Sequence, residues 1–125
     1  MDITPPVAAK RQLIQGYGDG GFRISGQRHM GSILVLPHLT MPWPRDEITN
    51  LSLEDLAPIR DASEPVGVLL LGCGRTGALI APKLRAAVRE WGVVIEAMDT
   101  GAACRTYNVL LSEDRDVAAA LIAIS

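Results

Sequence analysis

The spacing of apolar residues changes after the first third of the chain. The stretch QLIQGYGDGGFRIS (12–25) has short apolar runs around a Gly/Asp cluster at 18–21, which predicts β structure with a turn. A longer apolar run at 32–36 predicts a strand that Pro37 ends. Prolines then interrupt LTMPWPRDEITN (39–50), so we expect a stiff surface connection there rather than a helix.

The middle of the chain alternates between helix-like and strand-like patterns. Ser52 and Asp55 resemble a capping box, which predicts a short helix over 53–59. The unbroken apolar run at 66–71 predicts a strand that is covered on both faces, and 93–98 predicts a second strand.

Between these two strands, apolar residues recur at helical spacing, and Pro82 is expected to be the first residue of that helix. The chain therefore predicts one βαβ unit in an α/β domain. Thr100 is expected to cap a second amphipathic helix over 101–112. The terminal run VAAALIAI (117–124) fits either a helix or a buried strand, and we favour the strand.

Composition limits the class of protein. The 125 residues are 48% hydrophobic and 21% charged, which indicates one compact domain, expected at 12–125 after a flexible arm at 1–11. A net charge of −2 without a basic stripe argues against nucleic-acid binding. No apolar run is long enough to span a bilayer, and the first residues do not resemble a secretory signal. With two cysteines, a reducing bacterial cytoplasm is the expected location.

Three glycines resemble a dinucleotide-binding fingerprint. Gly72, Gly74 and Gly77 form G-x-G-x-x-G directly after a predicted strand. In that fingerprint a helix begins within the motif, but here Pro82 would then lie inside the helix at a cost of about 3 kcal/mol. We therefore interpret the glycines as a tight turn and expect no nucleotide cofactor.

A weaker ligand hypothesis uses the same loop together with the helix that follows the next strand, since free helix amides can hold an anion. The candidate ligand residues are Gly74, Arg75, Thr76, Thr100, Arg105, Thr106 and Asn108. The favoured alternative is that these side chains cap, hydrogen-bond locally or face water. We identify no catalytic residues, and no histidine or cysteine pair has a short metal-binding spacing.

Two further side chains each allow two interpretations. Cys104 near a helix N-terminus could be nucleophilic, but its alanine neighbours favour a small core residue. Trp43, between Pro42 and Pro44, could be a partner-contact anchor or could fold back over the sheet.

The segment EAMDTGAACRTYNVLLSEDRDVAAALIAI (96–124) resembles the C-terminal signature of the family of mitochondrial complex I assembly factor 3 and its bacterial and archaeal relatives. YGDGGFRISG, GSILVLP, the tryptophan at 43 and LLLGCG match in order upstream. The resemblance implies a three-layer α/β fold with a mixed central sheet, a β-rich N-terminal element and a terminal strand. It implies no catalytic residues and no cofactor.

The mitochondrial member of that family helps to assemble NADH:ubiquinone oxidoreductase by binding partner proteins at the inner membrane. The resemblance thus implies a non-enzymatic protein-binding or assembly module with at most peripheral membrane association, and a homo-oligomer is compatible with it. The alternative is a small-molecule or anion-binding enzyme that uses the loop at 72–77 and the helix at Thr100.

Overall fold

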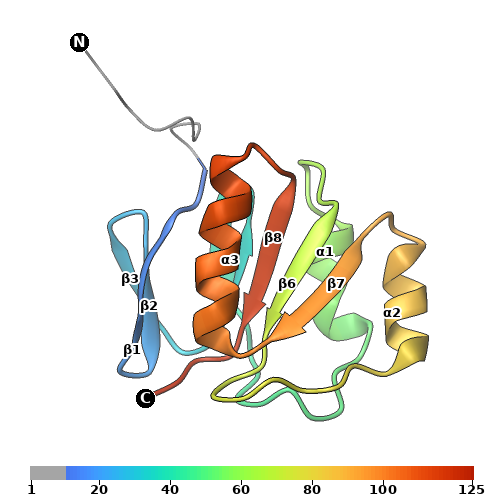
Figure 1. Ribbon diagram of the computed structural model, residues 1–125, viewed down its shortest axis with the longest axis horizontal. Helices are drawn as coiled ribbons and strands as arrows, with labels where there is room; N and C mark the ends of the chain where they lie inside the picture. Colours follow the sequence, from blue (N-terminus) through green and yellow to red (C-terminus); the bar gives the residue numbers. More distant parts are fainter. Residues whose placement is uncertain (1–10) are drawn as a thin grey trace.

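The computed structural model describes residues 11–125, and Figure 1 shows how its helices and strands are arranged. In chain order, the elements of this part are β1 (Ile14–Gly18), β2 (Gly21–Ile24), β3 (Gln27–Met30), β4 (Ile33–Leu36), β5 (Leu39–Pro42), a 3₁₀ turn η1 (Glu54–Leu56), α1 (Ala57–Arg60), β6 (Val68–Gly72), α2 (Pro82–Arg89), β7 (Val94–Met98), α3 (Thr100–Ser112) and β8 (Val117–Leu121). Of the expected arm at 1–11, residues 1–10 lie outside the described residues. Arg11 is described, and its side chain forms an ion pair with Asp114 at 3.6 Å.

A mixed five-stranded sheet forms the centre of the domain, in the order β5-β4-β8-β6-β7. β6 is parallel to both β7 and β8, whereas β4 is antiparallel to β5 and β8. The predicted βαβ unit is β6–α2–β7, and the structure adds a second crossover in which α3 connects β7 to β8. The terminal run therefore forms a strand, which confirms the prediction for it.

The central strands are apolar along their whole length because both faces are buried. Successive residues of β6 alternate between two core clusters: Leu69 and Leu71 face one, and Leu70 faces the other. The first cluster lies under α1 and α2. The second lies under α3 and also takes in Phe22 and Ile24 of β2. Figure 1 shows α3 on one side of the central sheet and α1 and α2 on the other, which gives the expected three layers.

The N-terminal element is a separate antiparallel sheet in the order β1-β2-β3, and it packs beside α3 (Figure 1). Side chains of α3 bond to the backbone around β1. The Tyr107 hydroxyl donates to the carbonyl of Gln12 at 2.6 Å. The Asn108 amide accepts from the Ile14 N–H at 3.1 Å and donates to the Ile14 carbonyl at 2.6 Å, as a neighbouring strand would. Helix α3 thus holds the small sheet in place.

Local signals explain the start of α2 and correct the expectation for 39–50. Helix α2 begins at Pro82, as predicted, because a proline in the first position has no helical hydrogen bond to lose.

The segment 39–50 is not a connection throughout. Leu39–Pro42 forms edge strand β5, paired with β4 through a tight hairpin. A proline is tolerated at the end of an edge strand because its missing N–H can face solvent.

None of the helices between residues 11 and 125 has the length and apolarity that a membrane crossing needs.

Candidate functional site

The carboxyl end of β6 is closed by hydrogen bonds between three segments. Gly74 and Thr100 bond reciprocally through their backbones and through the threonine hydroxyl: the Thr100 N–H donates to the Gly74 carbonyl at 2.8 Å, and the Gly74 N–H donates to Thr100 Oγ1 at 2.9 Å. Thr100 Oγ1 in turn donates to the Ile122 carbonyl at 2.7 Å. Thr100 is fully buried. Its hydroxyl and the two amides that could have received an anion are therefore engaged within the protein.

The glycines of the fingerprint have packing and turn roles. A Cβ on Gly72 would lie 2.8 Å from Leu121 Cδ2 and 3.1 Å from the Cα of Thr100, so only glycine fits there. Gly74 has a φ of +96°, which favours glycine. At Gly77 a Cβ would meet only ordinary contacts, and α2 begins five residues later. The interpretation of a tight turn agrees with this geometry.

This geometry predicts that nicotinamide and flavin dinucleotides at millimolar concentration leave the midpoint temperature of unfolding unchanged. A ligand at about 100 times its Kd would stabilise the fold by about 2.7 kcal/mol, which a thermal melt detects readily. A saturable upward shift that Gly74→Asp removes would contradict the assignment.

The N-terminus of α3 differs from the sequence expectation. Thr100 is the first residue of the helix, and Asp99 is the cap, because its carboxylate accepts from the Ala102 N–H at 2.9 Å. Aspartate is an equally good cap, and its charge is favourable beside the helix N-terminus. The Ala103 N–H bonds to the Asp99 carbonyl at 2.9 Å, so this first turn is satisfied locally. A carboxylate already occupies the position that an external anion would take.

The remaining ligand candidates are spread over the molecule. The Arg75 guanidinium bonds to the carbonyl of Ser125 at 2.9 Å, and that of Arg105 bonds to the Tyr17 hydroxyl at 3.1 Å. Thr106 contacts the sulfur of Met98 at 3.6 Å. The side chain of Thr76 is exposed, and Asn108 holds β1, as described above. The structure brings Gly74 and Thr100 together, whereas the side chains of Arg75, Arg105, Thr106 and Asn108 each bond to a different partner.

Both cysteines lie in surroundings that disfavour the thiolate. Cys104 is 3% exposed within the second core cluster, and burial raises the pKa of its thiol to about 12. Cys73 is half-buried, and desolvation raises its pKa as well. The small-core-residue interpretation of Cys104 is confirmed.

Thiol labelling of the native protein near pH 8 should therefore modify Cys73 first and Cys104 much more slowly. The neutral form of Cys104 is favoured in the folded state, so its contribution to stability is complete below its unfolded pKa and is lost as the pH rises toward about 12. Mass spectrometry of the labelled peptides distinguishes the two sites. Faster labelling of Cys104 than of Cys73 would contradict this assignment.

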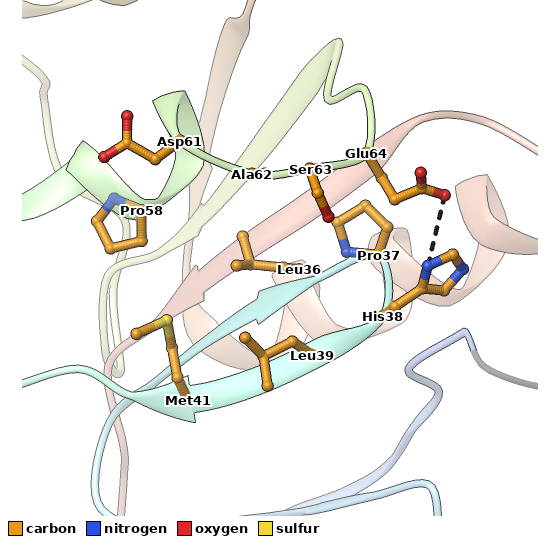
Figure 2. Close-up of a pocket in the computed structure, with 10 residues that line it drawn as sticks. All are labelled: Leu36, Pro37, His38, Leu39, Met41, Pro58, Asp61, Ala62, Ser63 and Glu64. Atoms are coloured by element: carbon orange, nitrogen blue, oxygen red, sulfur yellow. Dashed lines mark ion pairs between the residues drawn. The ribbon is translucent and has the colours of Figure 1, made fainter.

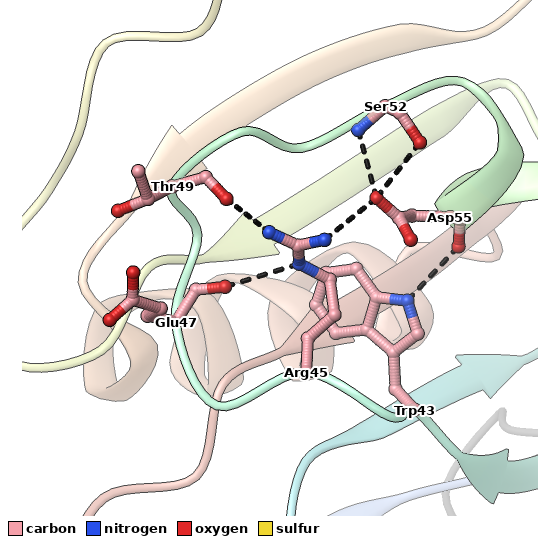
Figure 3. A network of polar contacts seen from close by, with 6 residues as sticks. All are labelled: Trp43, Arg45, Glu47, Thr49, Ser52 and Asp55. Atoms are coloured by element: carbon pink, nitrogen blue, oxygen red, sulfur yellow. Dashed lines mark hydrogen bonds and ion pairs between the residues drawn. The ribbon is translucent and has the colours of Figure 1, made fainter.

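Trp43 belongs to a network of polar contacts in the loop after β5 (Figure 3). Its ring is 4% exposed and belongs to the first core cluster. Its Nε1–H donates to the carbonyl of Asp55 at 3.0 Å. The Arg45 guanidinium pairs with the Asp55 carboxylate at 2.8 Å and also bonds to the carbonyls of Glu47 and Thr49. The indole therefore covers the sheet, and little of it remains exposed for the partner contact that the sequence also allowed.

The same loop forms one wall of an elongated cleft along β5, which the sequence did not reveal. One cavity, of about 330 Å³, lies between the β4–β5 hairpin and the end of α1 (Figure 2). A second, of about 240 Å³, lies between β5 and η1. Met41 and Pro58 line both cavities, so the two adjoin each other along β5. We call this cleft the β5 groove, lined by Leu34, Leu36–Leu39, Met41–Pro44, Glu54, Asp55, Pro58 and Asp61–Glu64.

Comparison with known proteins places the chain in a family. Residues 14–122 match the family model described as "Protein of unknown function (DUF498/DUF598)". The chain belongs to this family. An uncharacterised protein of Rhodobacter capsulatus is 41% identical over 109 residues, which cover 87% of this chain and 82% of that one.

Two further proteins are similar to the chain. A Xenopus tropicalis protein named NADH dehydrogenase [ubiquinone] 1 alpha subcomplex assembly factor 3 is 33% identical over 115 residues, which cover 92% of this chain and 63% of the frog protein. The chain thus spans less than two thirds of that relative. A crystal structure described as an outer membrane protein from Bartonella henselae matches with a TM-score of 0.85 and 37% identity, covering 92% of this chain and 97% of that one. This solved structure shares the α/β fold of the chain.

Proposed function

We propose that this chain is a protein-binding assembly module that acts in the biogenesis of respiratory complex I, NADH:ubiquinone oxidoreductase. The observation that carries the proposal is the match with the frog assembly factor, which extends over 92% of this chain. An assembly factor works by binding partner proteins. We therefore expect the exposed surface, rather than an enclosed site, to carry the function, with at most peripheral contact with a membrane.

The internal use of the ligand candidates supports this proposal. Thr100 joins three segments at the end of β6, and Asn108 joins α3 to the N-terminal sheet. Their polar groups serve the fold, which leaves recognition to surface residues. The β5 groove is a surface feature that is open to a partner and mainly apolar along β5.

Deletion of the gene in the organism that encodes the chain tests the proposal. We expect less assembled NADH:ubiquinone oxidoreductase on native gels of its membranes, with the amount of succinate dehydrogenase unchanged as a control. The intact chain, supplied from a plasmid, should restore the complex. Equal amounts of assembled complex with and without the gene would contradict an assembly role.

A further inference from the structure

We propose that the β5 groove binds an amphipathic helix of a partner protein whose apolar face is flanked by Lys and Arg residues. This inference rests on the proposed function and adds the chemistry of the partner. Leu39 is 54% exposed, and Met41 and Pro58 are half-buried along its length. Figure 2 shows the side chains of Leu36, Leu39 and Met41 pointing from the hairpin toward the opposite wall. A row of apolar side chains of this kind can take the apolar face of a helix.

The charge of the opposite wall determines the partner's polar residues. The segment 43–65 supplies the residues of that wall and holds six acidic residues and two arginines, a net charge of −4. Four of the six acidic residues line the groove: Glu54, Asp55, Asp61 and Glu64. The whole chain has a net charge of −2, so all other residues together carry +2. The negative charge is thus concentrated beside the groove. A partner with basic residues flanking its apolar face would be complementary to this wall.

The existing ion pairs show which acidic residues of the groove already have an arginine partner within the chain. Asp61 is paired with Arg60 at 2.8 Å, and this arginine lowers the pKa of the Asp61 carboxyl. Asp55 is paired with Arg45 inside the loop network. Glu54 is exposed at one end of the groove.

Glu64 is exposed at the other end of the groove, where its carboxylate lies 3.4 Å from His38. Glu54 and Glu64 therefore define the two ends of the acidic wall.

The backbone of β5 favours a helix over an added strand. Alternate residues of an edge strand direct their N–H and C=O groups outward. β5 has four residues, of which the last is Pro42, and buried Pro37 precedes the strand in the hairpin turn. Proline has no N–H, so this edge presents few donors for another strand. A helix satisfies its own backbone and needs only side-chain contacts.

Two synthetic peptides of about four helical turns test the proposal against the full-length protein. One has leucines at i, i+3, i+4 and i+7 with lysines elsewhere, and the other has the same leucines with glutamates. Amide shifts in ¹⁵N-labelled protein should move for the Leu/Lys peptide along β5, the hairpin and α1, and binding should weaken as salt is raised. The Leu/Glu peptide should bind at least about tenfold more weakly.

Matched variants locate the contact. Leu39→Asp should weaken the Leu/Lys complex about tenfold or more, whereas Val109→Asp should leave it unchanged, because both side chains are 54% exposed but Val109 lies on α3. The double variant Glu54→Lys/Glu64→Lys, at two exposed positions, should reverse the preference between the peptides. Shifts scattered over the whole surface, or equal effects of Leu39→Asp and Val109→Asp, would overturn the proposal.

A second copy of the chain is the competing occupant. Sedimentation would then show a dimer that Leu39→Asp dissociates, and this result would also overturn the proposal. The experiments distinguish a failure of the groove inference from a failure of the proposed assembly role. Restored complex I without peptide binding would refute only the groove inference. Peptide binding in the groove without any effect of gene deletion on complex I would refute only the proposed function.

Discussion

Replacing Trp43 by alanine is expected to lower the free energy of unfolding by about 3–5 kcal/mol. The indole is 4% exposed and packs in the core cluster beneath α1 and α2. Its removal leaves a cavity and also deprives the Asp55 carbonyl of the Nε1–H donor at 3.0 Å. Chemical denaturation followed by far-ultraviolet circular dichroism measures the loss.

Two other variants separate packing from hydrogen bonding. Trp43→Phe keeps most of the ring contacts and should lose about 1–2 kcal/mol. Trp91→Ala removes a half-buried indole that lies beneath the guanidinium of Arg60, at 5.9 Å, and should cost less than Trp43→Ala. A Trp43→Ala protein that unfolds at the same denaturant concentration as the parent would show that the indole does not support the core.

The Thr100→Val variant should lose about 2–4 kcal/mol of stability. Valine has nearly the same shape, so the change removes the hydroxyl with little change in volume. The Gly74 N–H and the Ile122 carbonyl then lose their partner at a fully buried position. Each buried polar group without a partner costs about 1–3 kcal/mol. Amide hydrogen exchange at Gly74 should accelerate in the variant, since the Gly74 N–H no longer has the Thr100 hydroxyl as its acceptor.

Thr106 provides the matched control for this prediction. Its hydroxyl lies in the same helix and contacts only a weak acceptor, the sulfur of Met98 at 3.6 Å. Thr106→Val should therefore change stability by less than about 1 kcal/mol. Thr100→Ser should retain most of the stability, because it keeps the hydroxyl. If Thr100→Val and Thr106→Val were equally stable, the hydroxyl of Thr100 would not fasten the loop.

Patterns within single segments predicted much of the fold. The segments 66–71 and 93–98 became β6 and β7 within one or two residues. The run at 66–71 is apolar throughout because a buried parallel strand needs apolar side chains on both faces. Pro82 located the start of α2, since proline is disfavoured at interior helix positions. These features depend on the residues themselves and on their immediate neighbours.

Features that depend on partners distant in the chain were not predictable in the same way. Leu39–Pro42 reads as a proline-interrupted connection until Leu34 and its neighbours pair with it. Thr100 was a reasonable cap by residue type, but its hydroxyl bonds to groups 26 and 22 residues away. The β5 groove likewise needs a hairpin and a loop that no local pattern brings together. The candidate site therefore emerged from the structure rather than from the sequence.

The position of β8 has a consequence for how the chain folds during synthesis. This strand lies inside the central sheet, paired with β4 on one side and β6 on the other, yet it follows every other element in chain order. Until β8 has left the ribosome, β4 and β6 each have an unpaired inner edge, and both are apolar along their length. Unpaired apolar strand edges promote aggregation. The nascent chain is thus most exposed to misassociation just before its last strand emerges, and this is the interval in which a chaperone would protect it.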